Sequence, residues 1–254
     1  MDGDTHPKKI KLMEVCGSHT MAIAKFGIRQ MLPENVELIS GPGCPVCVTP
    51  NSMIDKMIAL SNLPNLTIAT FGDMMRVPGS STSLLEQKAK GAKIEIVYSP
   101  LDALDLAQNT NGDVVFLGVG FETTAPTVAA TIVRAKKLEI QNFSVLCAHK
   151  NMPGALELIA NDPNVAVDGL ILPGHVSTIT GLSPYQFLAD KYKIPGVVAG
   201  FEAPDIILAI KMLCAQIDSG IAKIENAYKR GVREAGNQTA IDLIKEVFET
   251  CTSN

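Results

Sequence analysis

The stretch Val114-Val-Phe-Leu-Gly-Val-Gly-Phe-Glu-Thr-Thr-Ala-Pro126 determines the fold class of this chain. It opens with an apolar run, Val114–Val119, that lacks polar alternation, as is typical of a strand covered on both faces. A short turn then leads into a helix expected over Thr124–Leu138, with Pro126 in the first helical turn, where its missing N–H costs little. A buried strand that passes directly into a helix is the repeating unit of α/β proteins.

The same strand-then-helix pattern extends in both directions along the chain. Further strands are predicted at Lys9–Val15, Val36–Ile39, Thr67–Phe71, Lys93–Tyr98, Phe143–Cys147, Leu170–Leu172 and Val197–Phe201. Further helices are predicted at His19–Met31, Ser52–Ser61, Ser83–Lys90, Leu101–Gln108, Pro153–Ala160, Ser183–Lys191, Pro204–Ser219 and Asn237–Phe248. We therefore expect an α/β protein with two lobes of parallel sheet flanked by helices and a helical C-terminal portion.

A second segment, Val198-Ala-Gly-Phe-Glu-Ala-Pro204, resembles the first one: each runs from a strand through Gly-Phe-Glu to a proline. The repeat is explained either by two similar turns, which α/β proteins form often, or by two related lobes with matched loops facing a shared cleft. On the second interpretation, residues 1–110 and 111–202 form the two lobes and 203–254 the C-terminal helices. In both cases the loops lie at the carboxyl ends of strands, where open α/β sheets bind ligands.

Composition excludes several classes of protein. The 254 residues include 46% hydrophobic residues, enough for a large core, and a formal net charge of −4 without a basic cluster argues against nucleic-acid binding. No apolar run approaches the length needed to span a bilayer, and the polar N-terminus does not resemble a signal peptide. We therefore expect a cytoplasmic protein that has no nucleic-acid or membrane partner.

Three of the six cysteines, Cys16, Cys44 and Cys47, lie close together in sequence, each in a Gly- or Pro-rich setting. In a reducing compartment, clustered thiols indicate metal or redox chemistry before structural disulfides. Cys16 leaves a strand and opens a helix, whose N-terminal dipole stabilises a thiolate, and His19 lies one turn further on. The alternative interpretation of Cys16 is a small buried residue in a capping loop. The other three cysteines are expected in the core (Cys147 and Cys214) or beside the frayed C-terminus (Cys251).

The second thiol loop is Ser40-Gly-Pro-Gly-Cys-Pro-Val-Cys-Val-Thr-Pro50. Its prolines and glycines stiffen a Cys-x-x-Cys, a spacing that suits two thiols chelating a metal or closing a reversible disulfide. Together with Cys16 and His19, this loop also has the ligand count of a structural Cys3His zinc site. Zinc sites of that kind usually stabilise small domains that have no hydrophobic core, whereas this chain has enough hydrophobic residues to form one.

Single polar residues after other predicted strands form a third group of candidates: Asp73, Glu122, His149, His175 and Glu202. Each alone is more often a loop or capping residue than a catalyst, and only their shared position at strand ends raises their interest. The chain contains no P-loop, no Gly-x-Gly-x-x-Gly after a strand, no His-Glu-x-x-His and no Gly-x-Ser-x-Gly, so no motif supports ATP, NAD or hydrolase chemistry.

Several motifs in order along the chain resemble those of the HypD family. They are Glu14-Val-Cys-Gly-Ser-His-Thr20, Gly41-Pro-Gly-Cys-Pro-Val-Cys47, Phe71-Gly-Asp-Met-Met-Arg-Val-Pro-Gly79, Tyr98-Ser-Pro-Leu-Asp-Ala103, Gly120-Phe-Glu-Thr-Thr124, Pro173-Gly-His-Val-Ser177 and Val198-Ala-Gly-Phe-Glu202. The resemblance implies a scaffold for metallocofactor assembly, rather than a turnover enzyme, in the maturation of NiFe-hydrogenases. It also implies a HypC-type chaperone as partner, a HypE-type protein as cyanide donor, and the hydrogenase large subunit as the indirect recipient.

By the same resemblance, Cys16 would ligate iron while the Fe(CN)2CO unit is built, and Cys44 and Cys47 would form a redox-active or relay pair. His19, Glu122 and His175 would line the same cleft, and Asp73 belongs to a further matching motif. Family members continue into a cysteine-rich segment that binds a four-iron, four-sulfur (4Fe–4S) cluster, whereas here only Cys251 lies near that region. One cysteine cannot supply four ligands, so the sequence predicts no such cluster in this chain. The alternative function is a dithiol/disulfide oxidoreductase that uses Cys44 and Cys47.

Overall fold

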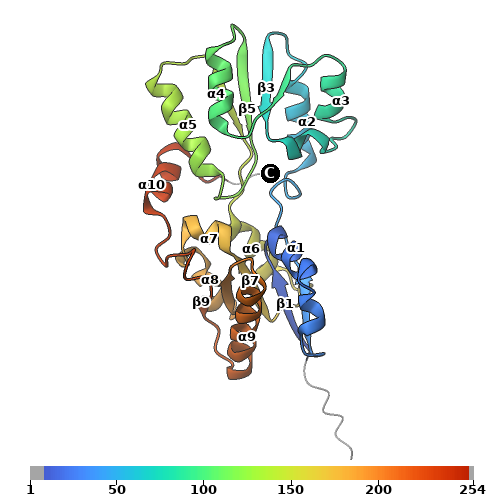
Figure 1. Ribbon diagram of the computed structural model, residues 1–254, viewed down its shortest axis with the longest axis vertical. Helices are drawn as coiled ribbons and strands as arrows, with labels where there is room; N and C mark the ends of the chain where they lie inside the picture. The colour runs from blue at the N-terminus through green and yellow to red at the C-terminus, as the bar shows by residue number, and fades with distance from the viewer. Residues whose placement is uncertain (1–8, 252–254) are drawn as a thin grey trace, which may run out of the picture. The chain divides into compact units, whose positions relative to one another are not determined.

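The computed structural model describes residues 9–251, which form two compact units, each built around one sheet (Figure 1). Unit 1 contains the residues up to Cys44 together with Asn151–Gln238, and unit 2 contains Pro45–Lys150 together with the residues from Thr239 onward. Every strand pair in both sheets is parallel. The predicted fold class, α/β with two parallel sheets flanked by helices, is confirmed.

The two units are discontinuous in sequence and differ from the contiguous lobes 1–110 and 111–202 and the helical portion 203–254 that the sequence predicts. The reason is strand pairing. The first strand, β1 (Ile10–Glu14), pairs on one side with β2 (Val36–Ser40) and on the other with β7 (Gly169–Pro173). The first lobe therefore completes its sheet only when the chain returns after residue 150.

Unit 1 has a five-stranded sheet in the order β2-β1-β7-β8-β9. Its last two strands are β8 (Gly196–Ala199) and β9 (Ile224–Asn226). Its helices are α1 (Gly17–Lys25), η1 (Ile28–Met31), α6 (Met152–Asn161), α7 (Gly174–Thr180), η3 (Ser183–Tyr185), α8 (Gln186–Asp190) and α9 (Ala203–Ser219). One hydrophobic cluster joins strands, α1 and α9 through fully or almost fully buried side chains such as Leu12, Ile23, Ile171, Ile206 and Leu213. Each such side chain stabilises the unit by about 1.5–3 kcal/mol.

Unit 2 has a four-stranded sheet in the order β4-β3-β5-β6. Its strands are β3 (Leu66–Thr70), β4 (Ile94–Ile96), β5 (Asp113–Gly118) and β6 (Phe143–Cys147). Its helices are α2 (Asn51–Leu60), η2 (Gly72–Arg76), α3 (Leu84–Ala89), α4 (Pro100–Gln108), α5 (Ala125–Lys137) and α10 (Gln238–Val247). The first residue of α10 is the last residue of unit 1. Both faces of this sheet are buried. Phe116 and Leu117, neighbours in β5, belong to different hydrophobic clusters because successive side chains of a strand point to opposite faces.

Each sheet has a switch point, where the chain stops adding strands on one side and continues on the other, and it lies at the second strand of the order in both sheets. In unit 1, the chain goes from β1 to β2 on one side, and β7 then pairs with the other side of β1. In unit 2, β4 and β5 flank β3 in the same way. At such a switch point the loops after the two inner strands diverge and leave a crevice at their carboxyl ends, which is where α/β sheets bind ligands.

The structure also differs locally from the prediction. The segment after Glu202, predicted to be helical, contains the strand β9, whose three residues are too short for a recognisable strand pattern. In addition, α7 starts directly after β7, so His175 lies in a short helix. Cys147, predicted in the core, is exposed because it ends the edge strand β6, whereas Cys214 is half-buried. No helix within residues 9–251 is long and apolar enough to cross a membrane.

The start of α4 offers a test of local sequence control in unit 2. Ser99 accepts a hydrogen bond from the Leu101 N–H and Asp102 accepts one from the Ser99 N–H, which forms a capping box before Pro100. We expect Ser99→Ala to lower the free energy of unfolding by about 1 kcal/mol, and Ser99→Asp to retain most of it, because Asp also caps helices well. Urea titration followed by circular dichroism measures both; equal midpoints for Ser99→Ala and the wild type would contradict the assignment.

Candidate functional site

Cys16 lies at the N-terminus of α1, directly after β1. Its backbone is extended (φ −153°, ψ 126°), and its carbonyl accepts hydrogen bonds from the N–H groups of His19 (2.9 Å) and Thr20 (3.2 Å), which begins the helix. The side chain is half-exposed and is not in a disulfide. The loop after β1 flanks the switch point of unit 1. The Cys16 thiol therefore lies both at the positive end of the α1 dipole and at the end of the sheet where α/β proteins bind ligands.

The loop after β2 packs closely against the Cys16 loop. A Cβ atom on Gly43 would lie 2.3 Å from the Gly17 nitrogen and 2.6 Å from the Cys16 Cα, distances that real Cβ atoms do not adopt. Only glycine allows this approach, and the next residue, Cys44, is half-buried. Two of the three clustered cysteines are thus carried by adjacent loops of unit 1.

A buried carboxylate ties together the two strands that carry these loops. Glu14, the last residue of β1, is fully buried, and its Oε1 accepts hydrogen bonds from Ser40 Oγ (2.9 Å) and Arg29 Nη2 (3.2 Å). Burial raises the pKa of Glu14, and the Ser40 hydroxyl and the Arg29 guanidinium oppose this effect. The motif Glu14–Thr20 is visible in the sequence, but nothing in the sequence distinguishes Glu14 from its neighbours.

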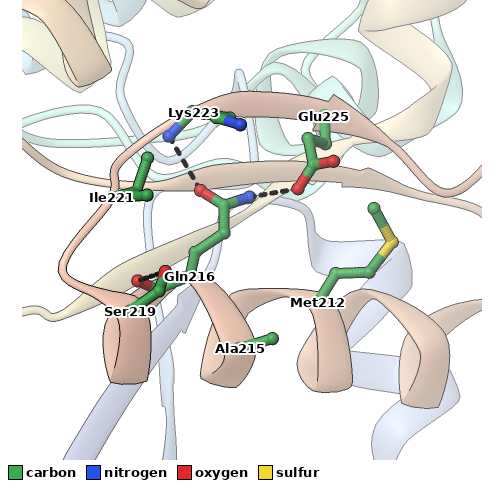
Figure 2. Close-up of a pocket in the computed structure, with 7 residues that line it drawn as sticks. All are labelled: Met212, Ala215, Gln216, Ser219, Ile221, Lys223 and Glu225. Atoms are coloured by element: carbon green, nitrogen blue, oxygen red, sulfur yellow. Dashed lines mark hydrogen bonds between the residues drawn. The ribbon is translucent and has the colours of Figure 1, made fainter.

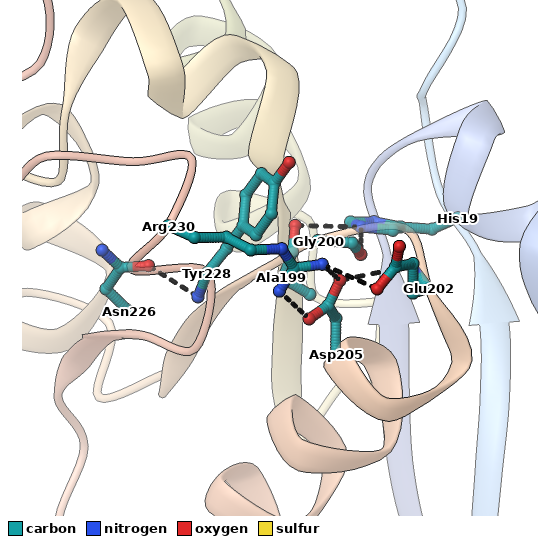
Figure 3. A network of polar contacts seen from close by, with 8 residues as sticks. All are labelled: His19, Ala199, Gly200, Glu202, Asp205, Asn226, Tyr228 and Arg230. Atoms are coloured by element: carbon teal, nitrogen blue, oxygen red, sulfur yellow. Dashed lines mark hydrogen bonds and ion pairs between the residues drawn. The ribbon is translucent and has the colours of Figure 1, made fainter.

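His19 turns into the core of unit 1. Its side chain is fully buried, and Nε2 donates to the carbonyl oxygens of Gly200 (3.0 Å) and Ala199 (3.3 Å) at the end of β8 (Figure 3). Nδ1 is also buried and has no hydrogen-bond partner. Burial lowers the pKa of His19 to about 4, against the two carbonyls, so the ring is neutral at pH 7.

Phe201 lies between His19 and His175 in unit 1. Its ring stacks on His19 with centroids 4.7 Å apart and on His175 with centroids 3.9 Å apart. Tyr228 meets the same ring edge-on at 6.3 Å. Because His19 is buried and His175 is exposed, the stack leads from the core to the surface. The structure therefore brings together the predicted residues His19 and His175 through Phe201, which the sequence analysis did not single out.

An ion-pair network fixes the loop that carries Phe201. Arg230 contacts both carboxylate oxygens of Asp205 at 2.6 Å and Glu202 at 3.0 Å, and its guanidinium lies 4.9 Å from the Tyr228 ring (Figure 3). Arg230 lowers the pKa of Asp205 and keeps it ionised. Glu202 and Asp205 also form the capping box of α9, so Glu202 has a structural role. Arg230 lies in the segment predicted as helical, and no sequence signal linked it to Asp205.

The remaining predicted residues belong to unit 2. Asp73 is exposed in η2, after β3, and Glu122 is half-buried in the loop after β5, so these two carboxylates flank the switch point of that unit. Cys47 is exposed in a turn that the Thr49 hydroxyl stabilises by donating to the Pro45 carbonyl at 2.9 Å. The chain passes from unit 1 to unit 2 between Cys44 and Pro45, within the Cys-x-x-Cys motif itself.

Of the residues considered for a Cys3His zinc site, Cys16, His19 and Cys44 belong to unit 1 and Cys47 belongs to unit 2. Within residues 9–251, no group of three or more His, Cys, Asp or Glu side chains is arranged to hold a metal ion. In unit 1, the Nε2 atom of His19 is engaged by the backbone carbonyls of Ala199 and Gly200.

A surface hollow of about 220 Å³ lies elsewhere in unit 1, between the end of α9 and β9 (Figure 2). Its central residue, Gln216, donates to Glu225 Oε2 at 2.6 Å and accepts from the Lys223 N–H at 2.7 Å. These bonds attach the helix to the edge strand at its amino end. The carboxyl ends of the strands, where Cys16 and His175 are located, are the better candidate site.

The sequence is similar to proteins of hydrogenase maturation. The sequence model of the HypD family, described as "Hydrogenase formation hypA family", matches residues 2–254. Proteins named hydrogenase maturation factor HypD are similar throughout: that of Rhodobacter capsulatus is 46% identical over 97% of this chain, that of Escherichia coli K12 is 48% identical over 96%, and that of Azotobacter vinelandii is 44% identical over 97%. The chain spans about two thirds of these relatives, namely 66%, 66% and 67% of their lengths.

The close approach of the two thiol loops is testable with a pair of glycine variants. Gly43→Ala forces the loop away from Gly17, and we expect a loss of about 1–3 kcal/mol in the free energy of unfolding, together with faster alkylation of Cys16. Gly17→Ala is the matched control, because its Cβ would meet only the Gly43 carbonyl oxygen at 3.9 Å, an ordinary contact. Urea unfolding and peptide-resolved iodoacetamide labelling measure both effects. Equal behaviour of the two variants would show that the approach is not tight.

The burial of neutral His19 predicts a pH dependence of stability. Between pH 6.5 and about 4 the unfolded chain binds a proton at this residue and the folded chain does not, so folded stability falls as the pH is lowered through this range. The full shift corresponds to roughly 3 kcal/mol. The charge of His175 also lowers the pKa of His19 and the charge of Asp205 raises it, but burial has the largest effect and the pKa is lowered.

His19→Gln is the matched variant for this prediction, because its amide can still donate to the carbonyls of Ala199 and Gly200 but does not titrate. We expect the free energy of unfolding, measured by urea titration at several pH values, to fall less steeply in His19→Gln than in the wild type. Identical slopes would mean that His19 binds its proton equally well in the folded and the unfolded state, and would contradict the prediction.

Proposed function

The chain belongs to the HypD family of hydrogenase maturation proteins, and from this premise we propose that it holds iron through the Cys16 thiolate while the Fe(CN)2CO unit of NiFe-hydrogenases is assembled. Iron is the cargo of this process. The observation that carries the proposal is the position of Cys16: a half-exposed thiol at the N-terminus of a nine-residue helix, beside the switch point of unit 1.

The chemistry of this position supports an iron ligand. Thiolate is a soft donor that suits low-valent iron carrying strong-field ligands such as cyanide and carbon monoxide. The positive end of the α1 dipole stabilises the anionic sulfur, and the tight packing of Gly43 limits the movement of the loop. His19 is proposed to position Cys16 and not to bind iron, because its Nε2 donates to backbone carbonyls and holds the first turn of α1 against the end of β8.

Cys44 and Cys47 are proposed as the thiol pair of the same process. Oxidation of the two thiols to a disulfide releases two electrons and two protons, and its reversal takes them up. Neither cysteine is in a disulfide in this structure, and Cys47 is exposed and open to exchange. His175 is proposed to contact ligands at the exposed end of the Phe201 stack, and Asp73 and Glu122 are the corresponding candidates on unit 2.

The proposed partners follow from family membership. A HypC-type chaperone would bind the chain during assembly, a HypE-type protein would supply cyanide, and the hydrogenase large subunit would receive the finished unit. The relatives are about half as long again as this chain, so these partners are proposals for the part of the protein that the chain represents.

The proposal predicts an infrared signature that depends on Cys16. The chain is purified without oxygen after co-expression with HypC-type and HypE-type partners. We expect cyanide and carbonyl stretching bands together with bound iron, and the loss of both in Cys16→Ala, because the anchoring thiolate is gone. Cys214→Ala is the control, since Cys214 packs against the core of unit 1 and should leave the bands unchanged.

The alternative function is a thiol–disulfide oxidoreductase, favoured by the exposure of Cys47 in a stiff Cys-x-x-Cys turn. It predicts that disulfide reductase activity survives Cys16→Ala and is lost in Cys44→Ser or Cys47→Ser. Absence of bands and iron in the wild-type complex, combined with Cys16-independent reductase activity, would replace the scaffold proposal by this alternative.

A further inference from the structure

A cysteine and a histidine lie side by side at the end of β6, in unit 2. Cys147 is the last residue of this edge strand, and its Sγ is 3.5 Å from Nδ1 of His149. The thiol is exposed, although the sequence pattern predicted it in the core. An exposed sulfur within hydrogen-bond distance of an imidazole is the arrangement that makes a cysteine nucleophilic.

The imidazole ring of His149 is fixed in place by its surroundings. On both sides of it, the backbone is attached to β5 and its loop: Ala148 N–H donates to the Gly118 carbonyl at 2.8 Å and Lys150 N–H to the Gly120 carbonyl at 2.9 Å. The ring occupies the space above Gly118, where a Cβ atom would approach within 3.0 Å, and Phe248 packs on the ring with centroids 5.6 Å apart. His149 therefore holds its Nδ1 beside the sulfur without needing to be ordered by a ligand.

The two nitrogens of His149 have different surroundings, and this determines where the proton sits. Nε2 is buried without a hydrogen-bond partner, so a proton there would be an unsatisfied buried donor. A proton on Nδ1 instead has the Cys147 sulfur as its acceptor. Burial lowers the pKa of His149 to about 4, so the ring carries only one of the two protons at pH 7. The favoured form is thus a neutral imidazole whose Nδ1–H donates to Cys147.

We propose that Cys147, activated by the Nδ1–H of His149, is a thiol modification site that reacts with small-molecule disulfides. The hydrogen bond stabilises the negative charge on the attacking sulfur. The Cys147 thiolate attacks one sulfur of the disulfide, the S–S bond of the small molecule breaks, and a new S–S bond joins that half to the protein. The other half leaves as a thiolate and takes a proton from water, so the exchange needs no further oxidant.

The proposal is independent of the iron-binding role of Cys16 and is tested on the reduced, intact chain. Glutathione disulfide is the probe, and peptide-resolved mass spectrometry after acid quenching gives the rate of adduct formation at each cysteine. Cys251, also exposed, serves as the reference in the same sample. We expect Cys147 to react about three- to tenfold faster than Cys251, because the Nδ1–H of His149 stabilises the negative charge that the sulfur carries as it attacks.

Two variants of His149 distinguish a specific hydrogen bond from general packing. His149→Asn places an amide donor near the position of Nδ1, and we expect it to keep at least half of the rate advantage. His149→Gln places its amide near Nε2, away from the sulfur, and should reduce the Cys147 rate three- to tenfold, to that of Cys251. Thermal melting of both variants checks that unit 2 is folded.

The proposal is overturned if Cys147 in the wild type reacts no faster than Cys251, a comparison that needs no variant to fold. It is also overturned if His149→Gln melts like the wild type and reacts at the wild-type rate. A rate that falls equally in His149→Asn and His149→Gln would assign the effect to packing of the ring and would likewise reject the hydrogen bond.

Discussion

The parallel arrangement of all strands is the constraint on which the rest of the structure depends. Strands that run in the same direction end at the same edge of the sheet, so the loops that follow them gather there. In unit 1 this edge carries Cys16 after β1, the Gly43–Cys44 loop after β2, His175 after β7 and Phe201 after β8. Strand direction thus brings residues that are far apart in the sequence to one edge of the sheet, and strand order decides which of them are neighbours.

The sequence predicts the elements well because their signals are local. The apolar run of β5 and the proline at the start of α5 are visible within a few residues, and the structure has both. The organisation of the units is not local: β1 needs β7, about 160 residues later, and no change in composition marks the points where the chain leaves one unit and returns. The discontinuous units could therefore not be predicted from a reading of consecutive segments.

The candidate site shows the same division. Cys16, Cys44 and Cys47 stand out in the sequence because thiols in Gly- and Pro-rich loops are unusual, whereas the residues that fix the site are ordinary in their local context. Arg230 and Asp205, 25 positions apart, meet only because α9 and the segment after β9 both pack at the end of β8. The unsatisfied Nδ1 of His19 and the open face of Cys147 likewise depend on what covers them, which is information that only tertiary structure contains.

The two Gly-Phe-Glu segments show how one local sequence acquires two roles. In unit 2, Phe121 follows β5 and is buried, so it contributes apolar area to the core. In unit 1, Phe201 follows β8 and is only half-buried, and its two faces are covered by the imidazoles of His19 and His175. The difference comes from the neighbouring strands: β8 has α1 and α7 at its carboxyl end, and each supplies a histidine. The surroundings of a motif at a strand end therefore depend on the elements that strand order places beside it. In this protein that order stacks two histidines on Phe201, and one of them, His19, lies in the helix that begins after Cys16.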